Sequence, residues 1–271
     1  LVIFTCAVGL LTSKTIIPLF DSMISIFFVT MGAGAAGALN MWYEADLDKL
    51  MTRTCLRPIP SGKINRQHAL IFGIALSIIS IYGLYYFSNL LSSFLLFVTI
   101  AFYLFVYTIW LKRKTPQNIV IGGASGALPP VIGWTIATNS LTIEPITFFL
   151  IIFYWTPSHF WALSLYKADD YLKAKIPMLP ITNGIEETKK KILVYSLFML
   201  PVIILPYIIG FTGEIFLVSS LLLTFYYNYI CYDLYKFKKN KFDLNKAKKV
   251  FGYSILYLFL IFVLFLIDSL I

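Results

Sequence analysis

Apolar residues fill nine long segments of the chain, and polar residues gather in the short stretches between them. The segments cover residues 1–11, 22–43, 67–87, 91–111, 118–137, 143–165, 192–210, 214–232 and 250–270. A helix needs about 20 apolar residues to cross roughly 30 Å of hydrocarbon, and unbroken apolar runs of this length fit helices. The pattern therefore predicts an all-α membrane protein with nine transmembrane helices in a single domain over residues 1–271.

The first apolar segment is shorter than the others. Residues 1–11 would form a helix only about 16 Å long, at 1.5 Å per residue, before the polar residues Ser13 and Lys14. The chain starts at Leu1 and not at methionine. We expect the first helix to be truncated, with more residues before it.

Composition and charge narrow the class of protein further. Hydrophobic residues make up 59% of the chain, charged residues only 13%, and the mean hydropathy is +0.81, which excludes a soluble globular enzyme. Twenty-one of the 22 lysines and arginines fall in alternate loops, and only Lys14 falls on the other side. The positive-inside rule then places these loops on the cytoplasmic side of the membrane, which we expect to be a bacterial inner membrane. The net charge of +9 thus reflects topology in a lipid bilayer, and we expect no nucleic-acid partner.

Three oxygen-bearing side chains line up at the cytoplasmic end of the second segment. Asn40, Glu44 and Asp48 are spaced by four residues, so they share one face of a helix, whereas Asp46 points elsewhere. Two carboxylates with an amide suit Mg²⁺, which prefers one or two carboxylates together with phosphate oxygens. The alternative is that these acids pair with Lys49 and Arg53 at a wet helix end.

Cationic residues near this stripe favour a diphosphate ligand. Arg53 and Arg57 follow the stripe in the same loop, and Lys112 and Arg113 lie in the next cytoplasmic loop. Guanidinium groups match phosphate oxygens in pairs, and metal and cations together stabilise a leaving diphosphate. The sequence therefore predicts a site that binds and ionises an allylic diphosphate, with its hydrocarbon tail among the helices.

A second group of candidates follows from the sixth apolar segment. Asp169 and Asp170 come directly after it, and His159 lies within it between Trp155 and Trp161. The two tryptophans could shield a carbocation through their ring faces. An intramembrane histidine could ligate a metal, accept a proton, or be a satisfied core residue.

Small residues and prolines predict the packing of two segments. Gly122 and Gly126 have GxxxG spacing, and the glycines of residues 32–37 are interleaved with alanines; both patterns permit close approach of helices. Pro129 and Pro130 must bend or break the fifth segment.

Three separated motifs resemble the UbiA superfamily of intramembrane prenyltransferases. They are residues 40–62 (NMWYEADLDKLMTRTCLRPIPSG), residues 110–118 with 122–134 (WLKRKTPQN, GGASGALPPVIGW), and residues 155–163 with 170–180 (WTPSHFWAL, DYLKAKIPMLP). The first resembles the Asp-rich motif of the superfamily. Its MTRTCLRP segment is similar to the members that farnesylate haem.

The resemblance implies a UbiA-type helical bundle and a reaction that composition cannot show. Farnesyl diphosphate would alkylate a vinyl group of haem b, water would supply a hydroxyl, and diphosphate would leave. Mg²⁺ would be the cofactor, and haem A synthase or a terminal oxidase assembly a possible partner. The implied catalytic residues are Asn40, Glu44, Asp48, Asp170 and His159, the first three as metal ligands. The implied substrate-binding residues are Arg53, Arg57, Lys112, Arg113, Asp169, Tyr171, Trp155 and Trp161.

The chain departs from the family pattern at three positions. Glu44 stands where an aspartate is usual, and Ser158 replaces a proline that commonly precedes the histidine. Tyr166 stands where the second motif usually has an aspartate, so the number of magnesium ions stays open. Two other functions remain as alternatives: a quinone-pathway prenyltransferase, such as one acting on 4-hydroxybenzoate, and a polytopic transporter.

Overall fold

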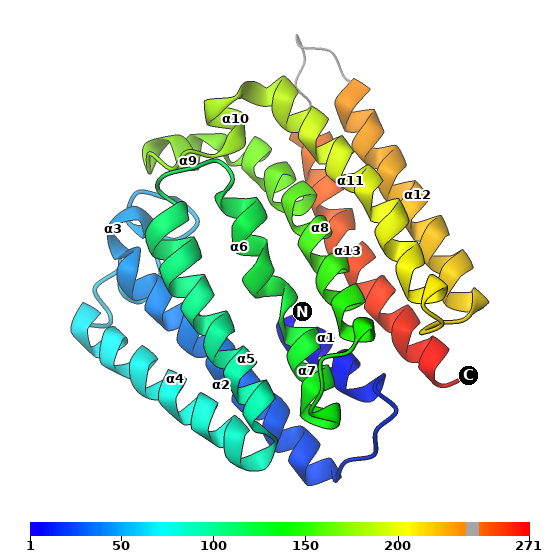
Figure 1. Cartoon of the computed structure of the whole chain (residues 1–271). Coiled ribbons are helices and arrows are strands. Elements are labelled where there is room, and N and C mark those ends of the chain that lie inside the picture. The colour runs from blue at the N-terminus through cyan, green and yellow to red at the C-terminus, as the bar shows by residue number, and fades with distance from the viewer. Residues whose placement is uncertain (237–243) are drawn as a thin grey trace. The chain divides into compact units, whose positions relative to one another are not determined.

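The computed structural model describes residues 1–236 and 244–271, and those ranges are helical without a strand (Figure 1). Three lysines and an acid of the last predicted basic loop, Lys238, Lys239, Lys241 and Asp243, lie outside the described residues. The described chain divides into two compact units. The first comprises residues 1–141 and 169–177, and the second comprises residues 142–168 and 178–271. The expectation of a single domain stays a prediction.

The first unit contains the helices of the N-terminal half. They are α1 (Val2–Leu11), α2 (Leu19–Tyr43), α3 (Ala45–Asp48), α4 (Arg66–Phe87), α5 (Leu90–Ala101), the π-helix η1 (Phe102–Leu111), α6 (Asn118–Ala127) and α7 (Pro129–Thr138). Helix α2 packs along α4, and η1 packs on both α2 and α6. These contacts bring the chain segment after α2 and the loop after η1 to the same end of the unit.

The predicted break in the fifth apolar segment is present. Helix α6 ends at Ala127 and α7 begins at Pro129, because a proline lacks the N–H that would continue the helical ladder. The close approach expected at Gly122 serves a side chain: a Cβ there would lie 2.2 Å from the ring of Tyr107. A Cβ added to Gly126 would meet no atom of the described residues within 4 Å, so the close approach expected at that position is not found among them.

Helices α1 and α7 approach each other closely at two glycines. A Cβ on Gly9 would lie 2.0 Å from the carbonyl oxygen of Pro130, and one on Gly133 would lie 1.9 Å from that of Cys6. Two helices can approach this closely only where neither carries a side chain at the contact. The ten-residue α1 is therefore held against α7 by two glycines.

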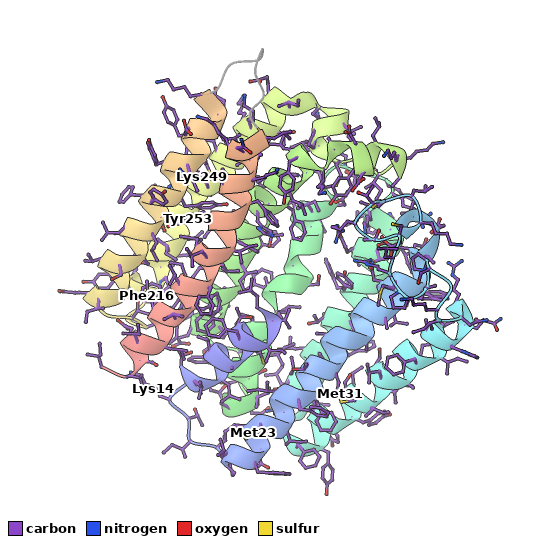
Figure 2. The ribbon with its side chains drawn as sticks, turned by 180° about the vertical axis from the view of Figure 1, so that it is seen from behind. Lys14, Met23, Met31, Phe216, Lys249 and Tyr253 are labelled. Carbon is purple, nitrogen blue, oxygen red and sulfur yellow. The ribbon has the colours of Figure 1, made fainter. Side chains whose placement is uncertain are left out.

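The second unit contains α8 (Ile143–Tyr166), α10 (Leu179–Thr182), α11 (Gly184–Ile208), α12 (Glu214–Lys236) and α13 (Leu244–Ser269). Helix α9 (Ala168–Lys173) starts at its boundary with the first unit. Figure 2 shows Phe216 and Lys249 at opposite ends of the α12–α13 pair. The carboxylate of Asp268 accepts hydrogen bonds from the backbone N–H groups of Gly213 (2.8 Å) and Phe216 (3.3 Å) and so caps α12.

Eight helical segments are long and apolar enough to cross a membrane in the described part of the chain. They match eight of the nine predicted segments, and the remaining prediction corresponds to the short helix α1. The all-α membrane architecture is confirmed. The count of nine spanning helices is not.

Candidate functional site

The predicted polar stripe lies where α2 gives way to α3. Backbone N–H groups of Glu44 and Asp48 bond to the carbonyl oxygens of Asn40 and Glu44, each at 2.9 Å, so the helical register continues across the junction. The guanidinium of Arg66 donates to the last carbonyls of α2, on Trp42 and Tyr43, and caps that helix. The three side chains are buried, with exposed fractions of 7% for Asn40, 1% for Glu44 and 3% for Asp48. Burial of two carboxylates at a helix end requires a specific arrangement of partners.

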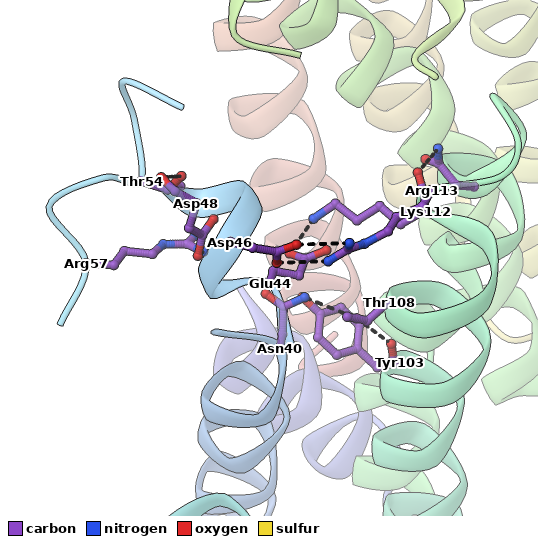
Figure 3. Close-up of polar contacts among 11 residues, drawn as sticks. Asn40, Glu44, Asp46, Asp48, Thr54, Arg57, Tyr103, Thr108, Lys112 and Arg113 are labelled. Atoms are coloured by element: carbon purple, nitrogen blue, oxygen red, sulfur yellow. Dashed lines mark hydrogen bonds and ion pairs between the residues drawn. The ribbon is translucent and has the colours of Figure 1, made fainter. Parts of the chain in front are cut away.

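The charge of Glu44 is balanced by a lysine that is distant in the sequence. The Oε2 of Glu44 lies 2.5 Å from the Nζ of Lys112, which follows η1, as Figure 3 shows. The ammonium also lies 5.7 Å from the ring centre of Tyr107. The second oxygen, Oε1, is buried and has no hydrogen bond within the described residues. A buried carboxylate oxygen without a donor is an open ligand position for a cation.

The amide of Asn40 is held by the π-helix. Its Nδ2 donates to Thr108 Oγ1 at 3.1 Å, and that hydroxyl donates to the carbonyl oxygen of Tyr103 at 2.9 Å (Figure 3). Because the amide nitrogen is engaged in this bond, the amide oxygen of Asn40 is left to accept or to ligate. π-Helical turns are often found at functional sites, and this one carries Thr108 and then Lys112 to the polar stripe.

Asp48 is paired within its own loop. The Nη1 of Arg57 donates to Asp48 Oδ2 at 2.8 Å, and the Thr54 hydroxyl donates to the Asp48 carbonyl at 3.1 Å. The alternative that these acids pair with Lys49 and Arg53 does not describe the contacts found: the partners are Arg57 and Lys112. Arg53 is exposed and makes no ion pair within the described ranges.

Asp46 is exposed, unlike Asn40, Glu44 and Asp48. Both of its oxygens accept from the guanidinium of Arg113, at 3.0 and 3.1 Å. Partial burial favours the neutral acid, but the hydrogen bonds and the charge of Arg113 outweigh it, so the pKa of Asp46 is lowered from 3.8. The same pair raises the pKa of Arg113 against the effect of burial. Arg113 also lies 5.2 Å from the ring centre of Tyr43.

The second acidic segment joins the first within the same unit. Thr52 Oγ1 lies 2.8 and 2.6 Å from the two carboxylate oxygens of Asp170. Asp170 and Tyr171 are buried, whereas Asp169 is exposed. Two sequence motifs separated by more than one hundred residues thus meet at one end of the unit.

Mg²⁺ fits the side chains at this end. The candidate donors are hard oxygen atoms of Asn40, Glu44 and Asp48, and one buried oxygen of Glu44 has no partner among described residues. In the described chain no cluster of three His, Cys, Asp or Glu side chains could hold a metal on its own. Two carboxylates with an amide, completed by phosphate oxygens, are the kind of set that Mg²⁺ prefers.

The predicted histidine and tryptophans lie in the second unit, on α8. The imidazole of His159 stacks on Trp155 with ring centres 4.3 Å apart and on Phe251 of α13 at 4.6 Å. Trp161 is buried on another side of α8 and meets the ring of Tyr195 edge-on at 5.3 Å. Within the described residues, no carboxylate is among the contacts of His159.

Three residues in these contacts were missed by the sequence reading. Thr108, Thr52 and Ser254 bind Asn40, Asp170 and His159 respectively, and hydroxyl residues in apolar helices are too common to stand out. Thr108 could have been noticed because it precedes Lys112 by four residues. Ser254 offers no comparable signal.

Comparison with known proteins gives the class of this chain. Residues 1–256 match the model of the UbiA prenyltransferase family. The chain belongs to the UbiA prenyltransferase family.

Several relatives carry a more specific name, and two of them serve as examples. A protein of Pelagibacter ubique (strain HTCC1062) named protoheme IX farnesyltransferase is 73% identical over 99% of this chain and 89% of its own length. One of the same name from Parvibaculum lavamentivorans (strain DS-1 / DSM 13023 / NCIMB 13966) is 46% identical over 99% of this chain and 85% of its own length.

Solved structures support the fold. A digeranylgeranylglyceryl phosphate synthase aligns with a TM-score of 0.82 at 18% identity, over 99% of this chain and 92% of its own. A UbiA homolog from Archaeoglobus fulgidus bound to DMAPP and Mg²⁺ aligns with a TM-score of 0.68 at 16% identity, over 97% and 95%. The UbiA-type helical fold predicted from the motifs is thereby confirmed.

Proposed function

We propose that this chain transfers the farnesyl group of farnesyl diphosphate to a vinyl group of haem b, giving haem O and diphosphate. The observation that carries the proposal is 73% identity, over nearly the whole chain, to a protein named protoheme IX farnesyltransferase. The polar cluster supports it independently, because buried carboxylates held by lysine and arginine are suited to a magnesium diphosphate. This reading is favoured over a quinone-pathway prenyltransferase.

The polar cluster would bind the diphosphate end of the prenyl donor. Asn40, Glu44 and Asp48 would hold Mg²⁺, which when bound neutralises charge on the leaving diphosphate. Lys112 and Arg57 lie on the carboxylates of the stripe, so they are placed to shift toward phosphate oxygens when these charges are shared with a metal. Arg53, exposed and without an ion pair in the described chain, would add a further cation.

The loops around the second aspartate would complete the binding of the donor. Asp170 is fixed by the Thr52 hydroxyl next to the loop that carries Arg53 and Arg57. Tyr171 is buried beside it, and Asp169 and Arg113 are exposed at the same end of the unit. We assign substrate contact to these residues, with Asp170 orienting the loop that faces the diphosphate.

The aromatic cluster of the second unit would serve the acceptor. Cleavage of the carbon–oxygen bond leaves an allylic cation, the vinyl group attacks it, and water adds a hydroxyl while its proton is released. Trp155 and Trp161 offer ring faces that tolerate positive charge. His159 would act on haem, as a ligand of the iron or as an acceptor for the released proton.

The protein is integral to a membrane, and we place it in the bacterial inner membrane with the polar cluster toward the cytoplasm. The support is the distribution of lysine and arginine, which fall almost entirely in the loops on the side of Glu44 and Asp48. Haem A synthase or a terminal oxidase assembly would be the partner that uses the product.

The experiment that tests the function uses the purified full chain in lipid nanodiscs. Incubated with haem b, farnesyl diphosphate and Mg²⁺, it should give a farnesylated, hydroxylated haem detectable by mass spectrometry. A parallel reaction with 4-hydroxybenzoate should give no product. Prenylation of 4-hydroxybenzoate without modification of haem would transfer the chain to the quinone pathway, and inactivity toward both with ion uptake in vesicles would favour a transporter.

A further inference from the structure

The imidazole of His159 is fixed in orientation by two parallel rings. Trp155, one turn earlier on α8, lies at 18° to it, and Phe251 on α13 lies at 22° on its other face. The exposed fraction of His159 is 8%. A ring stacked on both faces cannot rotate, so what each of its two nitrogen atoms can do is decided by its surroundings.

One of these nitrogens is engaged by a serine of α13. Ser254 Oγ lies 2.6 Å from His159 Nδ1 and also 2.6 Å from the carbonyl oxygen of Phe251. The hydroxyl has a single hydrogen, and a carbonyl has none to give. Two oxygen atoms at 2.6 Å repel each other unless that hydrogen lies between them, so the hydroxyl donates to Phe251 and must accept from Nδ1–H.

This assignment determines the other nitrogen. In a neutral imidazole that carries its hydrogen on Nδ1, the lone pair is on Nε2. Nε2 of His159 makes no hydrogen bond within the described residues, which therefore offer no group to take a proton onward from it. A fixed ring with a free Nε2 and a hydrogen-bonded Nδ1–H is the arrangement of a histidine that ligates a metal.

Ser254 also fixes the ring next to the histidine. Its carbonyl oxygen accepts from Trp155 Nε1 at 2.8 Å. The two rings held by Ser254 are four residues apart on α8, on one face of that helix. A single residue of α13 thus holds both the histidine and the ring stacked on it.

We propose that Ser254 is a positioning residue that fixes His159 in the Nδ1–H form and so presents Nε2 as an axial ligand to the iron of the haem substrate. The proposal rests on the proposed function and adds to it the role of His159 and the residue that sets it.

The first experiment reads the tautomer and needs no substrate. The chain has two histidines, so His68→Gln, at an exposed position of α4, leaves His159 alone. With ring-¹⁵N histidine in nanodiscs, NMR should show a protonated Nδ1 and an unprotonated Nε2. The Ser254→Ala substitution should give a mixture of tautomers or the Nε2–H form. An Nε2–H form in the parent, or a spectrum unchanged by Ser254→Ala, would overturn the proposal.

The second experiment reads the iron. Ferric haem added to the parent should give the absorption and electron paramagnetic resonance spectra of a histidine-ligated haem. Loss of a partner that orients a histidine ligand lowers metal affinity by about 10- to 100-fold, so Ser254→Ala should raise the Kd for haem by at least ~10-fold. Ser254→Thr keeps the hydroxyl and should restore both the spectrum and the affinity.

A matched control separates this effect from loss of packing. Ser220 on α12 is also fully buried and also bonds to the carbonyl three residues before it, on Leu217. Ser220→Ala removes the same atom and should leave the haem spectrum and the tautomer unchanged. Equal effects of the two alanine substitutions on haem binding would reduce Ser254 to a packing residue and contradict the proposal.

Failure of this proposal can be told from failure of the proposed function. Farnesylation of haem by a parent whose iron shows no histidine ligand would reject the ligand and leave the function standing, with His159 as a proton acceptor. Absence of any farnesylated haem, with the Nδ1–H form and a histidine-ligated iron present, would reject the function and leave a haem-binding site.

Discussion

The two clusters of buried polar groups neutralise their polarity in opposite ways. In the first unit, carboxylates meet cations: Glu44 with Lys112 and Asp48 with Arg57. In the second unit, His159 is held by a hydroxyl and two aromatic rings without any charged partner in the described chain. Paired charges can be redistributed when a charged ligand arrives, whereas a ring held by short hydrogen bonds and stacking stays in place. The first arrangement suits a diphosphate, and the second suits a flat, largely apolar acceptor.

Removal of a carboxylate from the first cluster should have the largest effect. Asp48→Ala deletes a proposed magnesium ligand and leaves Arg57 without its partner, so kcat/KM should fall by at least about 100-fold. Steady-state farnesylation of haem measures this, with circular dichroism to show that the helices persist. The matched control is Asp46→Asn in the same short helix, which should lose only a few-fold; near-normal activity of Asp48→Ala would refute the metal assignment.

A substitution of His159 should show that the second cluster has a different role from the first. His159→Leu removes the proposed ligand of the haem iron while leaving every charged pair of the first unit intact, so turnover should fall by about 100-fold. Binding of a non-reactive farnesyl thiodiphosphate with Mg²⁺ should be unchanged, as measured by calorimetry. If binding of the diphosphate fell in parallel with turnover, the division of labour between the clusters would be wrong.

The close contact between α1 and α7 can be tested by measuring the thermal stability of glycine variants. Gly133→Ala would place a methyl group against the backbone of α1, and overpacking of this kind costs about 1–3 kcal/mol of unfolding free energy. Gly126→Ala is the control, because nothing lies within 4 Å of its added carbon and alanine favours helix by ~1 kcal/mol. Thermal unfolding in nanodiscs should rank Gly133→Ala below the parent and Gly126→Ala at or above it.

Loss of the hydrogen bonds between Thr52 and Asp170, which join the two acidic motifs, should have a smaller effect on activity. Thr52→Val removes the donor to both oxygens of Asp170, and a hydrogen bond to a charged group contributes about 1.5 kcal/mol, equivalent to roughly 10-fold. The loss should fall on KM for farnesyl diphosphate more than on kcat. Thr52→Ser keeps the hydroxyl and should restore KM. Equal KM values for the valine and serine variants would show that the Thr52 hydroxyl has no part in substrate binding.

The exposed ion pair should matter least. Asp46→Asn removes one partner of Arg113, and such pairs contribute no more than ~0.5 kcal/mol. Because the pKa of Asp46 is lowered on folding, its contribution is present at neutral pH and is lost as pH falls through the lowered pKa. The small difference in thermal midpoint between parent and variant should therefore vanish in acid and in high salt. A difference that grew toward low pH would contradict this sign.

The parts of this picture that were predictable follow from periodicity and charge. Long apolar runs locate the spanning helices, because a backbone in lipid must satisfy its hydrogen bonds within a helix. Pro129 locates the break between α6 and α7, because proline cannot donate the hydrogen bond that would continue a helix. Asn40, Glu44 and Asp48, which their spacing singles out, are all buried, and their position on one common face stays a prediction. A carboxylate in an apolar chain is rare enough to be informative.

The partners of these residues could not be predicted, because they depend on contacts between distant segments. Nothing in the sequence shows that Lys112 meets Glu44 while Arg113 meets Asp46, or that a π-helix turns Thr108 toward Asn40. Gly122 was expected at a helix contact, and the ring of Tyr107 occupies that space. Such details are set by the packing of α2, η1 and α6, which no local pattern encodes.

The central claim is that the first cluster binds a prenyl diphosphate through Mg²⁺. Calorimetric titration of the purified chain with a non-reactive farnesyl thiodiphosphate, with and without Mg²⁺, tests it most directly. The account predicts binding that requires Mg²⁺ and is lost in Glu44→Gln. Equal affinity without the metal, and in that variant, would contradict it.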